Sequence, residues 1–199
     1  MTTWLSALTK PSVTNEPPAK GDQRRIDIAV IVTVLVALFN LSLAARLLPT
    51  LSFLFIAGAV WAWWEWRKIE PGSTEDLAIP AANPLQLTTA LIFAALFLAI
   101  SLVTAWVESI FGQAGILTLA ALVGASDIDP FVLNLAQGGA PDMGITALAG
   151  AVLIAASANN LAKAVYAIGF GGLAAAGRPA IALTVLALLG FAAAVDYLA

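Results

Sequence analysis

The stretch LQLTTALIFAALFLAISLVTAWVESIF occupies residues 85–111 and carries no charged side chain before Glu108. A continuous apolar run of this length can cross the hydrocarbon core of a bilayer, which takes about 20 helical residues. The rest of the chain has the same character, since 61% of its 199 residues are hydrophobic and 11% are charged. A typical soluble domain has about a quarter charged residues. We therefore expect an all-α integral membrane protein embedded in the lipid bilayer.

Five further apolar segments flank this run, so the sequence predicts about six transmembrane helices. The predicted spans are residues 28–48, 50–66, 85–111, 116–136, 145–170 and 179–198. Pro49 is expected to form the first turn, residues 112–115 a short turn and residues 171–177 a glycine-containing loop. We divide the chain into a disordered cytoplasmic tail (1–25), a two-span hairpin (26–66), a polar cytoplasmic loop (67–84) and a four-span domain (85–199).

The basic residues set the expected orientation. With the N-terminus inside, Arg46 and Arg178 are the basic residues on the outer side, whereas six lie on the cytoplasmic side. These six are Lys10, Lys20, Arg24, Arg25, Arg67 and Lys68. Positive charge favours cytoplasmic segments. We expect a multi-pass protein of the cytoplasmic (inner) membrane with both termini in the cytoplasm.

Composition excludes several classes of function. The chain contains neither cysteine nor histidine, so thiolate chemistry, the usual transition-metal centres and an imidazole-based serine triad cannot be built. A net charge of −3 with nine scattered Lys and Arg residues argues against nucleic-acid binding. No nucleophile or cofactor motif accompanies the carboxylates. We expect no enzymatic activity, no catalytic residue and no cofactor.

Three charged residues fall near the middle of predicted spans, namely Asp127, Asp129 and Lys163. An ionisable group at the bilayer centre costs roughly 2.5–3.5 kcal/mol, so three unpaired groups cost about 8–10 kcal/mol. Such residues are tolerated where they face one another, backbone groups or water inside the protein. They are therefore the principal candidates for a functional site.

The sequence around the aspartates predicts a break in the fourth span near mid-membrane. On a continuous helix the two carboxylates would point about 200° apart. Pro130 disfavours helical geometry at the preceding residue and suits the start of a new helix, which makes Asp129 a candidate N-cap. Ser126 belongs to the small residues that permit unwinding just before the break. Broken membrane helices line cavities, and in transporters they hold substrate or coupling-ion sites.

The fifth predicted span carries a polar stripe of Asn159, Asn160 and Lys163, which lie at neighbouring positions of a helix face. Ser157 and adjacent alanines permit close approach of another helix. Asn134, one turn after the proline, is a further oxygen donor. The predicted substrate- or ion-binding residues are Asp127, Asp129, Asn159, Asn160 and Lys163, supported by Ser126, Pro130, Asn134 and Ser157. The oxygen atoms of these side chains suit a hard cation or a proton, and the sequence does not specify a metal. In the alternative interpretation, Asp127 pairs with Lys163 and these polar residues have a structural role.

Several of these segments resemble the uncharacterised membrane domain found C-terminal to MgtC/SapB-type bacterial membrane domains. The matching motifs are NPLQL (83–87), ALIF (90–93), FGQAG (111–115), GASDID (124–129) and SANNLAK (157–163). The resemblance covers about residues 45–175. The family's earlier block, similar to Ser-Ser-Thr-Ala with a downstream arginine, is missing from residues 1–82. The chain thus resembles the second half of that domain, which implies a partner.

Two functions remain as hypotheses. The first is a half-size transporter, or transporter subunit, for an ion or a small solute, with cations or proton coupling favoured. The second is a non-transporting assembly or regulatory subunit whose buried charges fix helix register. Either would work as a homo-oligomer or with a separately encoded first-half membrane protein. The resemblance supplies no reaction, so transport is inferred from the buried charges.

Overall fold

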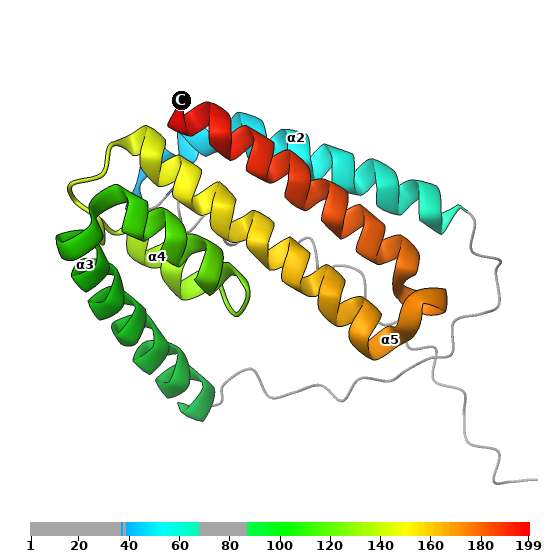
Figure 1. Cartoon of the computed structure of the whole chain (residues 1–199), viewed down its shortest axis with the longest axis horizontal. Coiled ribbons are helices and arrows are strands. Elements are labelled where there is room, and N and C mark those ends of the chain that lie inside the picture. The colour runs from blue at the N-terminus through cyan, green and yellow to red at the C-terminus, as the bar shows by residue number, and fades with distance from the viewer. Residues whose placement is uncertain (1–36, 38, 68–86) are drawn as a thin grey trace, which may run out of the picture.

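The computed structural model describes residues 37, 39–67 and 87–199, and every regular element in these ranges is a helix (Figure 1). The predicted tail (1–25), about half of the first predicted span (28–48) and nearly all of the predicted loop (67–84) lie outside the described residues. The described elements are α2 (Leu41–Trp66), α3 (Leu87–Gly124), α4 (Asp129–Ala136) and α5 (Ile145–Leu198). The expectation of an all-α architecture is confirmed for this part of the chain.

Helix α2 runs through the proline that was expected to end a span. Its N-cap is Asn40, whose side chain accepts a hydrogen bond of 2.9 Å from the Leu43 amide, and the helix continues past Pro49 to Trp66. The predicted turn at Pro49 is therefore wrong. Membrane helices tolerate an internal proline because neighbouring groups satisfy the backbone group it leaves unpaired. The Leu41–Trp66 segment is one helix, rather than the end of one span and the start of another.

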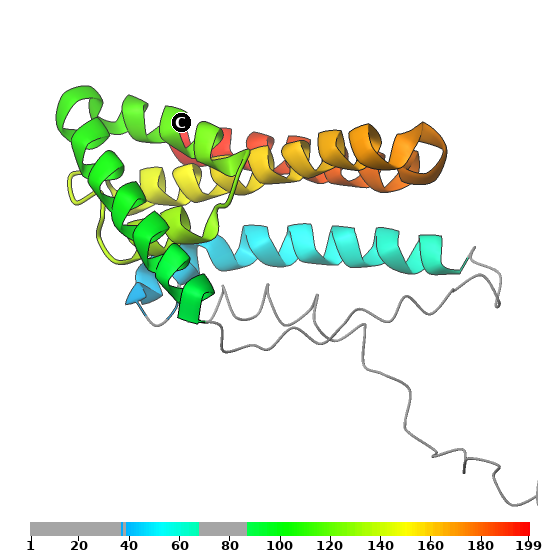
Figure 2. The same ribbon diagram turned by 90° about the horizontal axis from the view of Figure 1, so that it is seen from below.

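Helices α3 and α5 each consist of two segments joined at a single glycine. Gly112 has φ +57° and ψ −146°, and Gly172 has φ +72° and ψ 160°, conformations that residues with a side chain rarely adopt. α3 therefore comprises residues 87–111 and 113–124, and α5 comprises residues 145–171 and 173–198. The two halves of α5 lie side by side and antiparallel in both views (Figures 1 and 2). The turns were predicted at 112–115 and 171–177, but each is confined to one residue.

The second half of α3 and α4 form a helical hairpin, which we call the α3–α4 hairpin (residues 113–136). Residues 113–124 run away from Gly112, the chain turns at residues 125–128, and α4 runs back (Figures 1 and 2). The Asp142 amide donates a 3.1 Å hydrogen bond to Glu108 Oε1, which joins the residues before and after the hairpin. The predicted fourth span is thus not one helix interrupted along its axis: its two parts are antiparallel.

Most of the hydrophobic core lies between this hairpin and the first half of α5. Its most deeply buried side chains include Ile116, Phe131, Leu135 and Leu153, each 0% exposed. α2 packs on the other side of α5, beside its second half (Figure 1). The Tyr197 hydroxyl donates to the Arg46 carbonyl oxygen at 2.7 Å, which holds the start of α2 against the end of α5.

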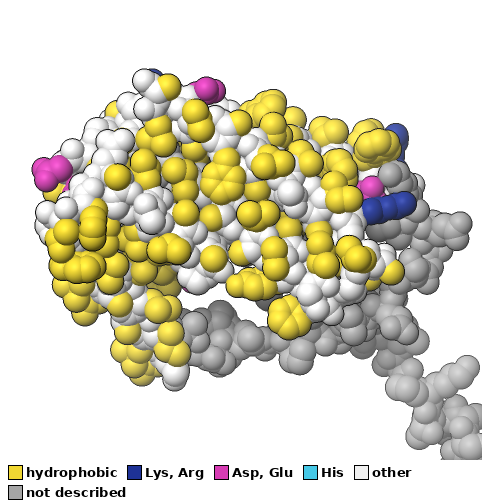
Figure 3. Space-filling model, viewed as in Figure 1, with side chains coloured by type: hydrophobic (Ala, Val, Ile, Leu, Met, Phe, Trp, Pro, Cys, Tyr) yellow, Lys and Arg dark blue, Asp and Glu magenta, His cyan; other side chains and the backbone are white. Residues whose placement is uncertain are grey.

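The described helices identify the chain as an all-α membrane protein. Within the described residues, three segments are long and apolar enough to cross a membrane: Leu41–Glu65, Ala90–Gly124 and Ile145–Leu198. Their outer surfaces are rich in exposed leucine, isoleucine, phenylalanine and tryptophan. Hydrophobic side chains are spread over the face shown in Figure 3, and the charged side chains visible there lie at its margins. This is the distribution that a bilayer requires.

The predicted alternation of spans disagrees with the contacts between helix ends. It placed Glu65 and Arg178 on opposite sides of the membrane, yet Arg178 Nη1 lies 3.3 Å from Glu65 Oε2. The hairpin explains the error, because a segment that turns back on itself was counted as a crossing. The two ends of the helical bundle are therefore the Arg178 end, with Glu65 and Gly172, and the Asp142 end, with Arg46, Gly112 and the C-terminus. Consequently, the C-terminus and Arg67 lie at opposite ends, not on one side as predicted.

Candidate functional site

The hairpin turn, residues 125–128, lies beside the middle of the first half of α5. Gly124 makes this close contact possible: a Cβ atom there would lie 2.7 Å from the Ala158 Cβ and closer still to the Ala155 carbonyl oxygen. From Gly112 to Gly124 a helix rises about 18 Å, and the bilayer core is about 30 Å thick. The turn is therefore at the depth of the membrane interior if the hairpin enters from the Asp142 end.

Side chains of α5 satisfy the carbonyl oxygens that the end of α3 leaves without helical partners. Asn159 Nδ2 donates to the carbonyl oxygen of Gly124 at 3.1 Å and to that of Ser126 at 3.5 Å. The Tyr166 hydroxyl donates to the Ala125 carbonyl oxygen at 3.2 Å. Residues 159 and 166 are seven apart, so both project from one face of the helix. α5 thus pairs three successive carbonyl groups of the turn.

Hydrogen bonds within the turn satisfy the remaining carbonyl oxygens at the end of α3. The amides of Ala125 and Ser126 donate to the carbonyl oxygens of Leu122 and Val123 at 3.2 and 2.9 Å, and the Ser126 hydroxyl also donates to Val123. Every carbonyl from residue 122 to residue 126 therefore has a donor. Since each unsatisfied backbone group costs several kcal/mol in hydrocarbon, this pairing would permit the non-helical turn to lie inside a membrane.

The two aspartates occupy different positions from those predicted. Ile128, not Asp129, is the N-cap of α4, and no side chain bonds to the cap amides. Instead, Asp127 Oδ1 accepts a 3.2 Å hydrogen bond from the Asp129 amide and so stabilises the turn. Pro130 is buried in the first turn of α4, as predicted. Both carboxylates are exposed.

Lys163 lies between Asn159 and Tyr166 on the same face of α5, and its side chain is also exposed. Its charge is close enough to attract Asp129, while Asp127 repels Asp129. Within the described residues, however, the Lys163 ammonium makes no ion pair with either carboxylate. The arrangement is an open cluster of three charges, which we call the tip cluster (Asp127, Asp129 and Lys163). It is not the closed ion pair of Asp127 and Lys163 that the structural alternative requires.

The other predicted residues lie at varying distances from this cluster. Ser126 is in the turn, and half-buried Asn160 follows Asn159 on α5. Ser157 is buried elsewhere, against Gly190 of the second half of α5. Asn134 is buried beside Gly139 at the far end of α4, and its Nδ2 has no hydrogen-bond partner among the described residues.

Tyr166 belongs to the site and was missed from the sequence. Its spacing of seven from Asn159 and three from Lys163 was the available signal. As for metals, the described residues contain no group of three or more acidic side chains placed to hold an ion. The anionic groups that a cation would meet at the turn are the carboxylates of Asp127 and Asp129.

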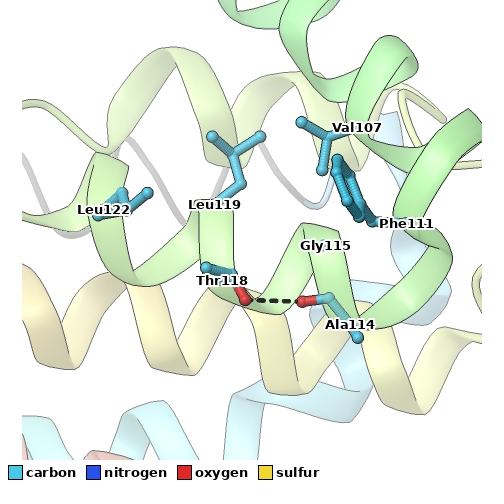
Figure 4. Close-up of a pocket in the computed structure, with 7 residues that line it drawn as sticks. All are labelled: Val107, Phe111, Ala114, Gly115, Thr118, Leu119 and Leu122. Carbon is cyan, nitrogen blue, oxygen red and sulfur yellow. Dashed lines mark hydrogen bonds between the residues drawn. The ribbon is translucent and has the colours of Figure 1, made fainter.

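A separate apolar pocket lies where the two halves of α3 meet (Figure 4). Its polar side chain is Thr118, whose hydroxyl donates to the Ala114 carbonyl oxygen at 2.9 Å. Gly115 allows the two segments to fold together, since a Cβ atom there would lie 2.7 Å from Val107 Cγ1. None of the predicted site residues lines it; the lining is Val107, Phe111, Ala114, Gly115, Thr118, Leu119 and Leu122.

Comparison with known proteins identifies the family. Residues 27–171 match the family described as "Domain of unknown function (DUF4010)", and the chain belongs to it. The sequence is also 37% identical, over 90 residues, to a protein of Aquifex aeolicus (strain VF5) named "Uncharacterized protein". The matched segment covers 45% of this chain and 39% of that relative, so the chain spans less than half of the relative's length. No solved structure matches the chain.

Proposed function

We propose that this member of the DUF4010 family is a transporter, or a subunit of one, that moves a small cation or couples a small solute to protons across the cytoplasmic membrane. The observation that carries the proposal is the tip cluster. Two carboxylates and an ammonium are exposed beside a non-helical turn, which would lie at membrane depth if the hairpin enters from the Asp142 end. In transporters, interruptions of this kind hold substrates and coupling ions.

The cost of exposed charge supports this assignment over contact with lipid. Three ionised groups facing hydrocarbon would cost about 8–10 kcal/mol, which is comparable to the whole stability of many proteins. Water or another protein surface must therefore meet the tip cluster. Because both signs of charge are present and no closed ion pair forms among the described residues, the cluster can exchange partners with a passing ion. A purely structural ion pair would be shielded.

The remaining parts of the proposal concern location and partners. We place the Arg178 end in the cytoplasm because it also carries Arg67, whereas Arg46 lies at the other end. We propose that the active unit is a homo-oligomer or a complex with a separately encoded first-half protein, because the sequence resembles only the second half of the domain. The protein is proposed to act without catalysis, cofactor or nucleic acid.

Flux into proteoliposomes tests the proposal. The purified protein is reconstituted, and uptake of Na⁺, K⁺, Mg²⁺ and protons is measured with ion-sensitive dyes after an ion gradient or a pH jump. Asp127→Asn removes a charge but keeps the oxygen that accepts the Asp129 amide, so the turn persists. We expect this variant, Asp129→Asn and Lys163→Ala to lose flux while eluting as the wild type does on gel filtration.

Asp196→Asn is the matched control, because Asp196 is an exposed aspartate near the end of α5 and far along the chain from the turn. It should retain wild-type flux. Unchanged flux in folded Asp127→Asn and Lys163→Ala proteins would remove the tip cluster from the transport path. Absence of flux in every protein, with loss of folding when the tip cluster is altered, would support the assembly-subunit alternative.

A further inference from the structure

We infer that the α3–α4 hairpin is re-entrant, entering and leaving the membrane at the Asp142 end, and that a hydrated cation reaches the tip cluster through an aqueous path from the Arg178 end. The inference deepens the proposed function by assigning the side from which the site is open, and it rests on that function for the identity of the ion. Its structural part does not depend on transport.

The re-entrant course follows from the contacts at the two ends of the hairpin. Glu108 precedes Gly112 by about one turn, Asp142 follows α4, and the 3.1 Å bond between them fixes both at one end of the bundle. Segments 113–124 and 129–136 are also too short to cross a bilayer core separately, since about 20 helical residues are needed. A hairpin that cannot cross must return to its side of entry.

The remaining helix ends agree with this course. α2 starts beside Tyr197 and ends beside Arg178, so it runs from the Asp142 end to the Arg178 end. Residues 87–111 end at the Asp142 end, at Gly112, after running at a steep angle to the helices of α5, and the two halves of α5 make one excursion to Gly172 and back (Figure 2). A hairpin that crossed would place Asp142 at the opposite end from Glu108, which their 3.1 Å hydrogen bond excludes.

Packing closes the site from the Asp142 end. Between the turn and that end, the hairpin and α5 enclose fully buried side chains, including Phe131, Leu135 and Leu153. No hydrated ion can pass through a dry, close-packed layer of this kind. The tip cluster therefore has no aqueous route along the hairpin axis.

Between the tip cluster and the Arg178 end, the α3–α4 hairpin does not cover α5. Lys163 precedes Gly172 by nine residues, or about 14 Å of helix, so the cluster lies within half a bilayer thickness of that end. The side chains along this stretch include Tyr166, which is 53% exposed, and Phe170, which is 92% exposed. Their rings lie 6.4 Å apart between centroids on this exposed stretch. The Lys163 ammonium can extend along it towards water.

Cysteine accessibility tests the inference cleanly because the natural chain has no cysteine. Single-cysteine variants are placed in proteoliposomes of determined orientation and treated from either side with a membrane-impermeant maleimide. Gln113→Cys and Gln137→Cys mark the two feet of the hairpin, and Gly177→Cys marks the Arg178 end. We expect both feet to label from one side and Gly177→Cys to label from the other.

Ser126→Cys and Ala125→Cys report on the turn, and both native residues are exposed. We expect each variant to react with the maleimide added on the side that labels Gly177→Cys. We expect no reaction when the maleimide is added on the opposite side. Labelling of the two feet from opposite sides would overturn the re-entrant course. Turn labelling from the Asp142 side, or from neither side, would overturn the access path. Flux is measured separately, so labelling as expected without flux would refute transport and leave the re-entrant course standing.

Discussion

Asn159 should be the most sensitive polar position of the site with respect to stability. It is 6% exposed and donates to the carbonyl oxygens of Gly124 and Ser126, whereas the adjacent Asn160 is half-buried and is not bonded to the turn. Asn159→Ala removes the donor and leaves the Gly124 carbonyl unpaired beside α5. We therefore expect this variant to destabilise the protein far more than Asn160→Ala does.

The magnitude follows from the cost of an unpaired buried acceptor, about 1–3 kcal/mol. Hydrogen bonds between membrane helices are measured at about 0.6 kcal/mol on average with a maximum near 1.7, which narrows the expected loss to about 1–2 kcal/mol. For a chain of this size each kcal/mol shifts Tm by about 2–4 °C, so Asn159→Ala should lower Tm by roughly 2–8 °C. Asn160→Ala should stay within about 0.5 kcal/mol of the wild type.

Thermal unfolding in a mild detergent, followed by circular dichroism at 222 nm and by gel filtration of heated samples, measures both variants under identical conditions. Asn159→Gln serves as a second variant, because it keeps the amide donor on a longer side chain and should recover part of the loss. Equal Tm values for Asn159→Ala and Asn160→Ala would refute the claim that Asn159 supports the turn.

Three further variants test neighbouring contacts. Tyr166→Phe keeps the ring beside Phe170 but loses the bond to the Ala125 carbonyl oxygen, so unfolding should become easier by about 0.5–1.5 kcal/mol; a Tm identical to that of the wild type would contradict this. Gly124→Ala places a methyl group against Ala155 and should cost about 1–3 kcal/mol, whereas Gly169→Ala, with open space around its Cβ position, should cost nothing or stabilise the helix. Arg178→Ala breaks an ion pair whose arginine side chain is 69% exposed, and we expect a loss of less than about 1 kcal/mol, with 0.5 M salt abolishing the difference in Tm.

The sequence was sufficient to predict the class of protein and an interruption of the helix near residues 125–129. Apolar runs longer than a soluble core requires predict membrane helices, and the described residues form helices of that kind. The charged residues at positions 127, 129 and 163, which are unfavourable in hydrocarbon, indicated that this region is unusual. The turn interrupts the helix just before Pro130, where the proline predicted an interruption. Composition and local stereochemistry were enough for these steps because both depend on residue types close together in the chain.

The direction of the chain after the turn could not be predicted in the same way. Hydropathy indicates how apolar a segment is, but it does not indicate whether the second of two short helices continues in the direction of the first or runs antiparallel to it. The reversal depends on tertiary contacts: the close packing of Gly124 on Ala155 and the bonds from Asn159 and Tyr166, residues 35 and 41 positions away. Pro49 is a similar case, because its tolerance inside α2 depends on surroundings that the local sequence does not contain.

The polar residues of this site are of two kinds, those that donate hydrogen bonds to the carbonyl oxygens of the turn and those that do not. The side chains of Asn159 and Tyr166 donate hydrogen bonds to backbone carbonyl oxygens of the turn, so the main effect of substituting them should be a loss of stability. Asp129 and Lys163 form no hydrogen bond or ion pair with their side chains among the described residues, and in a bilayer their ionised groups cost free energy. Removing either should leave Tm unchanged or raise it, as variants at functional positions that carry unfavourable charge often do. Asp129→Asn and Lys163→Ala proteins that are at least as stable as the wild type but carry no flux would show that these charges are kept for transport. A large loss of Tm in both variants would instead show that they hold the fold together.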